Sequence, residues 1–212
     1  MQGIRIEFEW ARFADYGVEV RPGRRGSLLS EVSTKLLVAL GPPEAALKTR
    51  PLELSSDLYL ELAKAKPTLE GHKEFAKRYG LLTDQQRDYI YQWPELVENM
   101  RNLVTMVANK EYWDIRNGSH VPYELPIKFA LRFGPTSEDG SGMALGIVPA
   151  NLYNALVLQC VSNRATGAEV HSCKACGGLF EIGGSSGHRS NREFCSDKCR
   201  FTFNHRSRRK RQ

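Results

Sequence analysis

The sequence predicts an α+β protein made of two parts, a mixed domain over residues 1–167 and a small cysteine-rich module over residues 168–212. Three observations lead to this prediction. Apolar and polar residues alternate as in strands near both ends of the first part, and apolar residues recur at helical spacing between them. Four of the five cysteines lie in the last forty residues. The chain of 212 residues is long enough for one medium and one small domain.

The first forty residues are typical of β-strands. Apolar and charged side chains alternate in the pattern of a half-buried strand, with apolar residues at Ile4, Ile6, Phe8 and Trp10. Val18 and Val20 indicate a return strand before the turn at residues 21–23. The apolar run over residues 33–40 fits either a short strand or a helix, and the Gly-Pro-Pro sequence at 41–43 ends it. Together these strands form the antiparallel portion of the first domain.

The middle of the chain predicts a succession of helices. Either Ser55 or Ser56 is a suitable N-cap for the first helix, which ends near Pro67. Thr68 is the expected N-cap of the second helix, and Gly80 is its stop signal. Both segments place apolar side chains three and four residues apart, so each is expected to bury one face against its neighbours.

Two further helices are predicted after residue 82. Thr83 or Asp84 is the expected N-cap of a short one that ends at Tyr91. Pro94 suits the first turn of the next, because a missing N–H costs nothing there. Apolar residues then recur at helical spacing, and the helix is expected to reach residues 117–118.

A hairpin and a helix complete the first part. Alternation over residues 127–133 and an apolar run over residues 143–148 predict two strands joined by a long loop. Asn151 is a good N-cap for a helix that ends at residues 165–167. Cys160 lies on an apolar stretch of this helix, where we expect a buried thiol with a packing role.

The remaining cysteines have the spacing of a metal site. They form one pair separated by two residues and another separated by three, with eighteen residues between the pairs: Cys173, Cys176, Cys195 and Cys199. Gaps of this size let both thiolates of a pair reach one ion. Four thiolates select zinc over harder cations, and the long arm between the pairs favours one structural zinc ion over an iron–sulfur cluster.

The residues around the cysteines predict how this module folds. The glycines at 177–178 give the backbone the freedom that a turn after the first pair requires. Ser196 can cap a helix, Asp197 suits the positive N-terminal end of that helix, and Cys199 falls in its first turn. The result is a treble-clef-like finger: a knuckle, a hairpin, then a helix with the last ligand. His205 could replace a cysteine, although the four thiols already close the shell.

The excess positive charge of the protein is confined to this finger. The net charge is +6, yet residues 1–170 carry a balance of −1 and residues 171–212 one of +7. A concentrated basic charge predicts an acidic partner, most often nucleic acid, although it also fits a solubilising tail. The residues expected to contact phosphate are Arg189, Arg192, Lys198, Arg200, Arg206, Arg208, Arg209, Lys210 and Arg211. Of Phe201 and Phe203 in the same helix, one is expected to pack on the finger.

The finger resembles the CGNR-type zinc fingers at the C-terminus of stress-induced bacterial transcription regulators. The matching positions are Cys173, Cys176, Phe180, Arg189 or Arg192, Phe194-Cys195-Ser196, Cys199 and the arginines that follow. The sequence departs from the family at its namesake element, where it has Cys199-Arg200-Phe201-Thr202. The resemblance implies a DNA-binding regulator whose finger holds zinc, with the N-terminal domain sensing a ligand or forming a dimer.

Two other functions fit the finger less well. A protein-interaction or inhibitor module would use it to dock on an acidic protein surface. A treble-clef nuclease would need a histidine base beside a catalytic metal; His188, Asn191 and His205 are available, but no carboxylate is placed with them. The phosphate-binding loop, nucleophile elbow and zinc-protease motifs are also absent from the sequence. The sequence therefore indicates a binding protein, most simply one that binds double-stranded DNA, rather than an enzyme.

The sequence also bears on location. No apolar run approaches the roughly 20 residues that span a bilayer, and no apolar segment follows the first residues as in a secretory signal. An odd number of cysteines, with one pair spaced as metal ligands, argues against a secreted disulfide framework. We therefore expect a cytoplasmic protein with no membrane partner.

Overall fold

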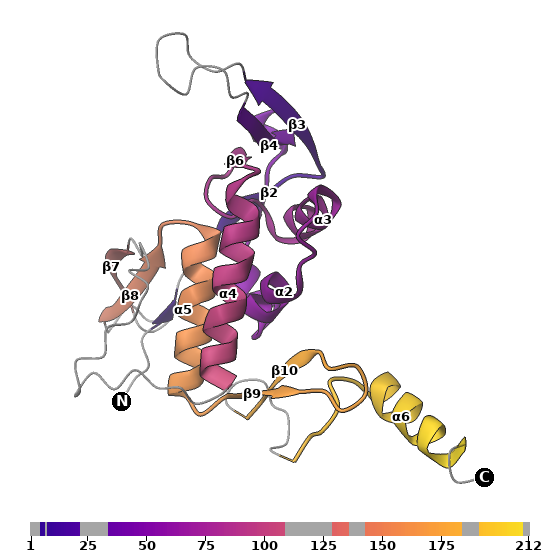
Figure 1. The fold of residues 1–212 in the computed structure, drawn as a ribbon. Coiled ribbons are helices and arrows are strands. Elements are labelled where there is room, and N and C mark those ends of the chain that lie inside the picture. The colour runs from indigo at the N-terminus through magenta and orange to yellow at the C-terminus, as the bar shows by residue number, and fades with distance from the viewer. Residues whose placement is uncertain are drawn as a thin grey trace, which may run out of the picture.

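The chain folds into mixed helices and strands, which confirms the predicted α+β class. In the computed structural model, the described residues are 5–6, 8–21, 34–108, 129–135, 143–183 and 191–209. The central helices and the strands around them form one body, and the last helix extends from the end of a hairpin below it (Figure 1).

Three helices make the centre of this body. Helices α4 (Gln92–Ala108) and α5 (Leu152–Ala165) lie side by side, and α2 (Leu58–Lys64) packs against both (Figure 1). The short helix α1 (Pro51–Leu54) precedes α2. Their apolar faces meet in one core whose fully buried residues include Leu58, Leu60, Leu62, Trp93, Val97, Met100, Val104, Leu152 and Leu156. Burial of these faces, rather than helix propensity, holds the short helices in place.

Two small antiparallel sheets lie beside helix α3 (Leu69–Tyr79). In the larger sheet, β4 (Thr34–Leu40) pairs with both β3 (Asp15–Arg21) and β6 (Arg87–Tyr89). The smaller sheet joins β2 (Trp10–Arg12) to β5 (Leu47–Thr49), which follows the 3-10 helix η1 (Pro43–Ala45). In the run over residues 33–40, left open as strand or helix, the described residues 34–40 are therefore a strand.

A third sheet contains the predicted hairpin. Strand β8 (Met143–Pro149) pairs antiparallel with β7 (Phe129–Pro135) and parallel with β1 (Arg5–Ile6). The predicted single strand from Ile4 to Trp10 is wrong in its extent, since β1 and β2 belong to different sheets. Pairing with distant segments, Gly146 for Arg5 and Thr49 for Trp10, determines this division.

Two of the predicted caps are confirmed in detail. The Thr68 side chain accepts a hydrogen bond from the Gly71 N–H at 3.2 Å, and α3 ends at Gly80, whose φ of 97° favours glycine. At the start of α5, the Asn151 side chain accepts a hydrogen bond from the Asn154 N–H at 2.8 Å. The end of α4 predicted at residues 117–118 lies outside the described residues.

The start of α2 differs from the prediction. Its N-cap residue is Asp57, without a capping hydrogen bond from its side chain, rather than Ser55 or Ser56. The Ser55 hydroxyl instead donates to the Asp57 carboxylate at 2.6 Å. Ser55 Oγ also accepts a hydrogen bond from the Asp57 N–H at 3.4 Å, a local side chain–backbone bond that competes with helix capping.

The predicted helix over residues 83–91 is wrong, because a buried carboxylate organises this segment as a loop and a strand. Asp88 is 2% exposed, and it accepts hydrogen bonds from the N–H groups of Leu82, Thr83 and Asp84 at 2.6, 3.1 and 3.0 Å. These bonds fold residues 82–84 into a local turn around the carboxylate. Residues 87–89 then pair with β4 as β6, and this long-range pairing takes the place of helical hydrogen bonds.

A buried histidine makes the stability of this body dependent on pH. His72 of α3 is 2% exposed and stacks on Trp93 with ring centroids 4.9 Å apart, and neither of its ring nitrogens has a hydrogen-bond partner. Burial lowers the pKa of His72 from its ordinary value of 6.5. The unfolded chain therefore binds a proton that the folded chain excludes, between the unfolded pKa and the lower folded one.

We expect the free energy of unfolding to fall as the pH drops from 7.5 through 6.5 and below. The substitution His72→Phe keeps a ring on Trp93 and removes the titrating group, so it should flatten this decline. Urea denaturation at pH 7.5, 6.5 and 5.5 measures the free energy of unfolding of the wild type and of His72→Phe. Parallel declines for the two would show that His72 is not the cause.

Candidate metal centre

The first cysteine pair lies in the turn of a hairpin. Strands β9 (Glu169–Ser172) and β10 (Leu179–Ile182) pair antiparallel, and residues 173–178 connect them. The Cys173 N–H donates to the Gly178 carbonyl at 2.9 Å, and the Gly177 N–H donates to the Cys173 carbonyl at 2.8 Å. Gly177 has a φ of 72°, which a residue with a Cβ adopts at a cost. This is the knuckle that the two glycines predict.

The second pair lies at the start of helix α6 (Asp197–Arg209). The Ser196 hydroxyl accepts a hydrogen bond from the Cys199 N–H at 3.2 Å, as expected for an N-cap. Cys199 is therefore held in the first turn, and Cys195 immediately precedes the cap. The Lys174 N–H donates to the Glu193 carbonyl at 3.1 Å, which ties the knuckle to the segment before Cys195. The two pairs, far apart in sequence, are thereby brought together.

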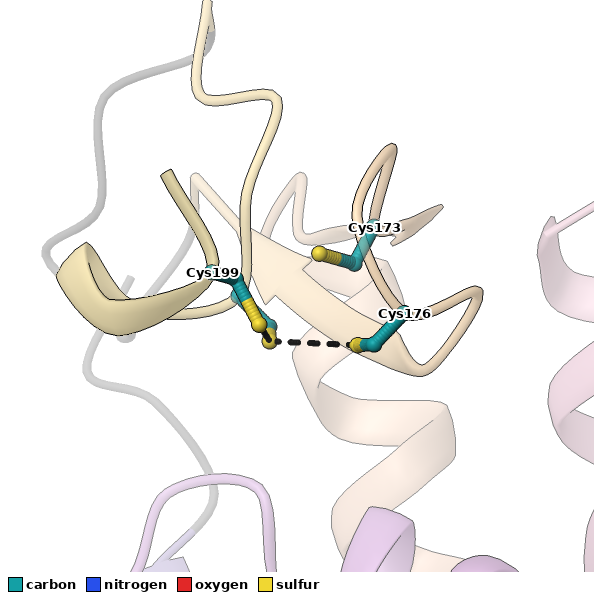
Figure 2. A group of neighbouring side chains, drawn as sticks. Cys173, Cys176 and Cys199 are labelled. Carbon is teal, nitrogen blue, oxygen red and sulfur yellow. Dashed lines mark hydrogen bonds between the residues drawn. The ribbon is translucent and has the colours of Figure 1, made fainter. Parts of the chain in front are cut away.

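The four sulfur atoms form one cluster. All lie within 4.8 Å of one another, with Cys176 Sγ 3.7 Å from Cys195 Sγ and Cys195 Sγ 3.5 Å from Cys199 Sγ. Figure 2 shows the side chains of Cys173, Cys176 and Cys199 directed toward a common centre. Tetrahedral zinc with bonds of about 2.3 Å requires sulfur–sulfur separations of about 3.8 Å. The four thiols lie close enough to hold a metal ion.

The electrostatics of the cluster differ between its members. Burial raises the pKa of the Cys173 thiol, but hydrogen bonds from the N–H groups of Cys195, Cys176 and Ala175 outweigh it and lower the pKa to about 6. Burial and the neighbouring Cys199 thiol raise the pKa of Cys195 to about 12. Metal binding requires the thiolate form, so a cation must displace the proton that Cys195 holds at neutral pH.

A small apolar core supports the cluster. Cys173, Phe180 and Ile182 are buried together, and Phe194 packs against them. Phe203 of α6 contacts Phe194 with ring centroids 5.3 Å apart, so it is the phenylalanine of α6 that packs on the finger. With so few buried side chains among the described residues, we expect this core to need a bound metal for its stability.

One predicted phosphate-binding residue has a local role in the structure. The Arg192 guanidinium donates to the carbonyls of Phe194 and Cys195 at 2.7 and 2.8 Å and lies 5.8 Å from the centre of the Phe180 ring. It therefore shapes the approach to Cys195. A contact between Arg192 and phosphate stays a prediction.

The other predicted basic residues belong mainly to α6, which projects away from the body (Figure 1). Lys198, Arg200 and Arg206 are exposed on it. Arg208 and Arg209 are within the helix, but their side chains are not among those described, and Arg189, Lys210 and Arg211 lie outside the described residues. The structure thus places three of the predicted basic side chains on one exposed helix that begins at the sulfur cluster.

The connection between the finger and the first domain is a feature that the sequence did not reveal. Glu181 of β10 is 1% exposed, and its carboxylate accepts hydrogen bonds from the Tyr59 hydroxyl at 2.5 Å and from Asn163 Nδ2 at 2.8 Å. Val170 of β9 belongs to the main core. The hairpin is therefore packed against α2 and α5. Glu181 stands between two apolar residues and has no pattern that predicts burial.

Two residues considered for nuclease chemistry are described. Asn191 and His205 are both exposed, and His188 lies outside the described residues. Among the residues that the structure describes, the clustered metal-ligand side chains are the four cysteines alone. His205 is therefore not a member of the sulfur cluster.

Comparison with known proteins gives no match: no family model, curated protein or solved structure corresponds to this chain. Within the described part of the chain, no helix has the length and apolar character needed to cross a membrane. Inferences about function therefore rest on the site itself.

Proposed function

We propose that the chain is a zinc-dependent nucleic-acid-binding protein in which the metal folds the finger and helix α6 offers its lysines and arginines to the phosphate backbone. The observation that carries this is the continuity of site and helix: Cys199 lies in the first turn of α6, and Lys198, Arg200 and Arg206 are exposed along it. Four soft thiolates favour zinc, and a shell closed by four protein ligands is typical of a structural ion.

The charge of the finger supports a polyanionic partner. A zinc ion with four thiolates has a formal charge of −2, which leaves residues 171–212 at about +5 at neutral pH. Arginine can fork onto two phosphate oxygens, and a helix that stands clear of the body can approach a nucleic acid without steric conflict. Phosphate contacts of this kind give affinity and orientation rather than sequence choice.

The resemblance to CGNR-type fingers supports a narrower form of the proposal. In it, the chain is a bacterial transcription regulator and its target is double-stranded DNA. Duplex DNA is therefore the first ligand to test. The alternative function is a docking surface for an acidic protein. A titration with duplex DNA separates the two functions, because a finger that docks on a protein would not bind DNA at physiological salt.

The test is a binding titration of duplex DNA by zinc-loaded protein across a salt series. We expect affinity to fall steeply with salt, since each neutralised phosphate adds about 0.9 to the slope of log K against log salt. The double variant Lys198→Gln with Arg206→Gln should weaken binding and reduce that slope by about 2. Fluorescence anisotropy at 50 to 200 mM salt is a suitable readout.

The matched control removes the same charge elsewhere. Lys66 and Arg78 are exposed on the first domain, so Lys66→Gln with Arg78→Gln should leave the affinity and the slope unchanged. Point variants are preferable to deletion of the finger, because β10 contributes buried Glu181 to the first domain. Equal losses in both double variants would indicate unspecific charge attraction, and no binding at low salt would overturn the proposal.

A further inference from the structure

Helix α6 carries an aromatic side chain that the finger does not use. Phe201 is 66% exposed, whereas Phe203 packs on Phe194 and the finger core consists of other residues. A single exposed apolar side chain is ordinary on a protein surface. The position of Phe201 is informative for another reason, namely the charged groups that surround it.

The Phe201 ring has a cation beside it. The Arg200 guanidinium carbon lies 5.4 Å from the centre of the ring, within range of a cation–π contact. That guanidinium also forms an exposed ion pair, with Arg200 Nη2 3.1 Å from the Asp197 carboxylate one turn earlier. Lys198 and His205, three residues before and four after Phe201, share its face of the helix. The ring therefore lies among groups that bind phosphate.

The same face does not fit a protein groove. A helix that docks in an apolar groove repeats apolar residues three and four positions apart. The positions at those spacings from Phe201 are polar or charged: Asp197, Lys198, Asn204 and His205. Proteins use an isolated ring beside basic side chains, as here Phe201 beside Arg200 and Lys198, to stack a base while they hold its backbone.

We propose that Phe201, with Arg200 beside it, stacks on an unpaired nucleobase, so that α6 prefers single-stranded nucleic acid, or an unpaired stretch of it, over an intact duplex. This inference rests on the proposed function, since the phosphate contacts supply most of the affinity. In a duplex the face of each base is covered by its neighbours, and the ring has no partner unless a base is unstacked. In a single strand every base offers a face, so the contact needs no particular sequence.

The experiment compares a 20-nucleotide oligo(dT) with a hairpin duplex of similar charge, using the full-length zinc-loaded protein. We expect Phe201→Leu to weaken binding of the single strand by roughly tenfold and of the duplex by less than about twofold. The salt slope should not change, because no charge is removed. Phe201→Trp should retain the affinity, and its indole fluorescence should be quenched by oligo(dT).

The controls separate this inference from the proposed function. Zinc content equal to that of the wild type confirms that Phe201→Leu leaves the finger folded, and a loss of zinc would show that the ring is structural and overturn the inference. If the protein bound both DNA forms and Phe201→Leu weakened the two equally, or weakened neither, the stacking site would be overturned. Phosphate binding would be left intact. No binding of either form at 50 mM salt would overturn both proposals.

Discussion

Chelation of the metal should unfold the finger from Cys173 to the end of α6 while helices α2, α4 and α5 stay folded. Among the described residues, the buried members of the finger core are Cys173, Phe180 and Ile182, which is too little apolar surface to fold such a module alone. Zinc binding to structural sites supplies roughly 10 to 16 kcal/mol of apparent free energy at neutral pH, so its loss removes the dominant stabilising term. The main core is a separate cluster of buried side chains in which the hairpin takes part through Val170 and Leu179, so it keeps the contacts that its helices make with one another.

Hydrogen exchange of the holoprotein and of the chelated protein measures this outcome segment by segment. Amides of α6 and the knuckle should exchange rapidly after chelation, and those of α4 and α5 should stay protected. Cys195→Ser should have the same effect and lower the bound zinc, because a serine hydroxyl is a poor fourth ligand.

The matched control for the thiol is Cys160→Ala. Cys160 is 1% exposed in α5, and burial raises its pKa to about 12, so it is an unreactive packing group distant from the cluster in sequence. Its substitution should leave the zinc content unchanged. Wild-type zinc content in Cys195→Ser, or none in the purified wild-type protein, would contradict the assignment of the site.

The features that could be predicted from the sequence are those determined by nearby residues. Thr68 and Asn151 cap their helices through N–H groups three residues away. The cysteine spacing predicts a cluster because each pair needs one tight turn, and Ser196 caps the helix that carries Cys199. In each cap and within each cysteine pair, the interacting groups lie about one turn apart, so the local pattern contains the information. The meeting of the two pairs depends in addition on the bond between Lys174 and Glu193.

The features that could not be predicted depend on segments distant in sequence. Residues 83–91 have cap-like residues, but the Asp88 carboxylate and pairing with β4 make them a loop and a strand. Phe8 and Trp10 continue the alternation of Ile6, but the chain passes to another sheet between β1 and β2. Long-range pairing overrides local propensity at such positions.

Glu181 is the clearest case, since its partner Tyr59 is 122 residues away. Nothing near it in the sequence indicates that this carboxylate is buried. It follows that the attachment of the finger to the first domain is a tertiary property, whereas the metal site is largely a local one.

Substitution of Glu181 by alanine should lower the free energy of unfolding by about 2–4 kcal/mol. The change leaves the Tyr59 hydroxyl and the Asn163 amide buried without the carboxylate that accepts from both. Burial and the bond to Glu181 raise the pKa of Tyr59 above its ordinary value of 10.0, so the hydroxyl stays a donor at neutral pH. Urea denaturation of the zinc-loaded variant and wild type measures this loss of unfolding free energy.

Glu193→Gln is the matched control, because Glu193 is an exposed residue of the same finger that forms an ion pair with Lys174. An exposed pair contributes little, so this variant should lie within about 0.5 kcal/mol of the wild type. A double-mutant cycle with Tyr59→Phe isolates the bond itself, and the two losses should be less than additive. Additive losses would mean that each side chain is stabilised by other neighbours.

The zinc content of Glu181→Ala then shows whether Glu181 only attaches the finger to the first domain or is also needed for the finger to fold. All four cysteines lie in the knuckle and at the start of α6, apart from the contact that Glu181 makes with α2 and α5. Glu181→Ala should therefore retain its zinc and its affinity for nucleic acid while losing stability in the first domain. If zinc and stability were lost together, the two parts of the chain would fold as one unit.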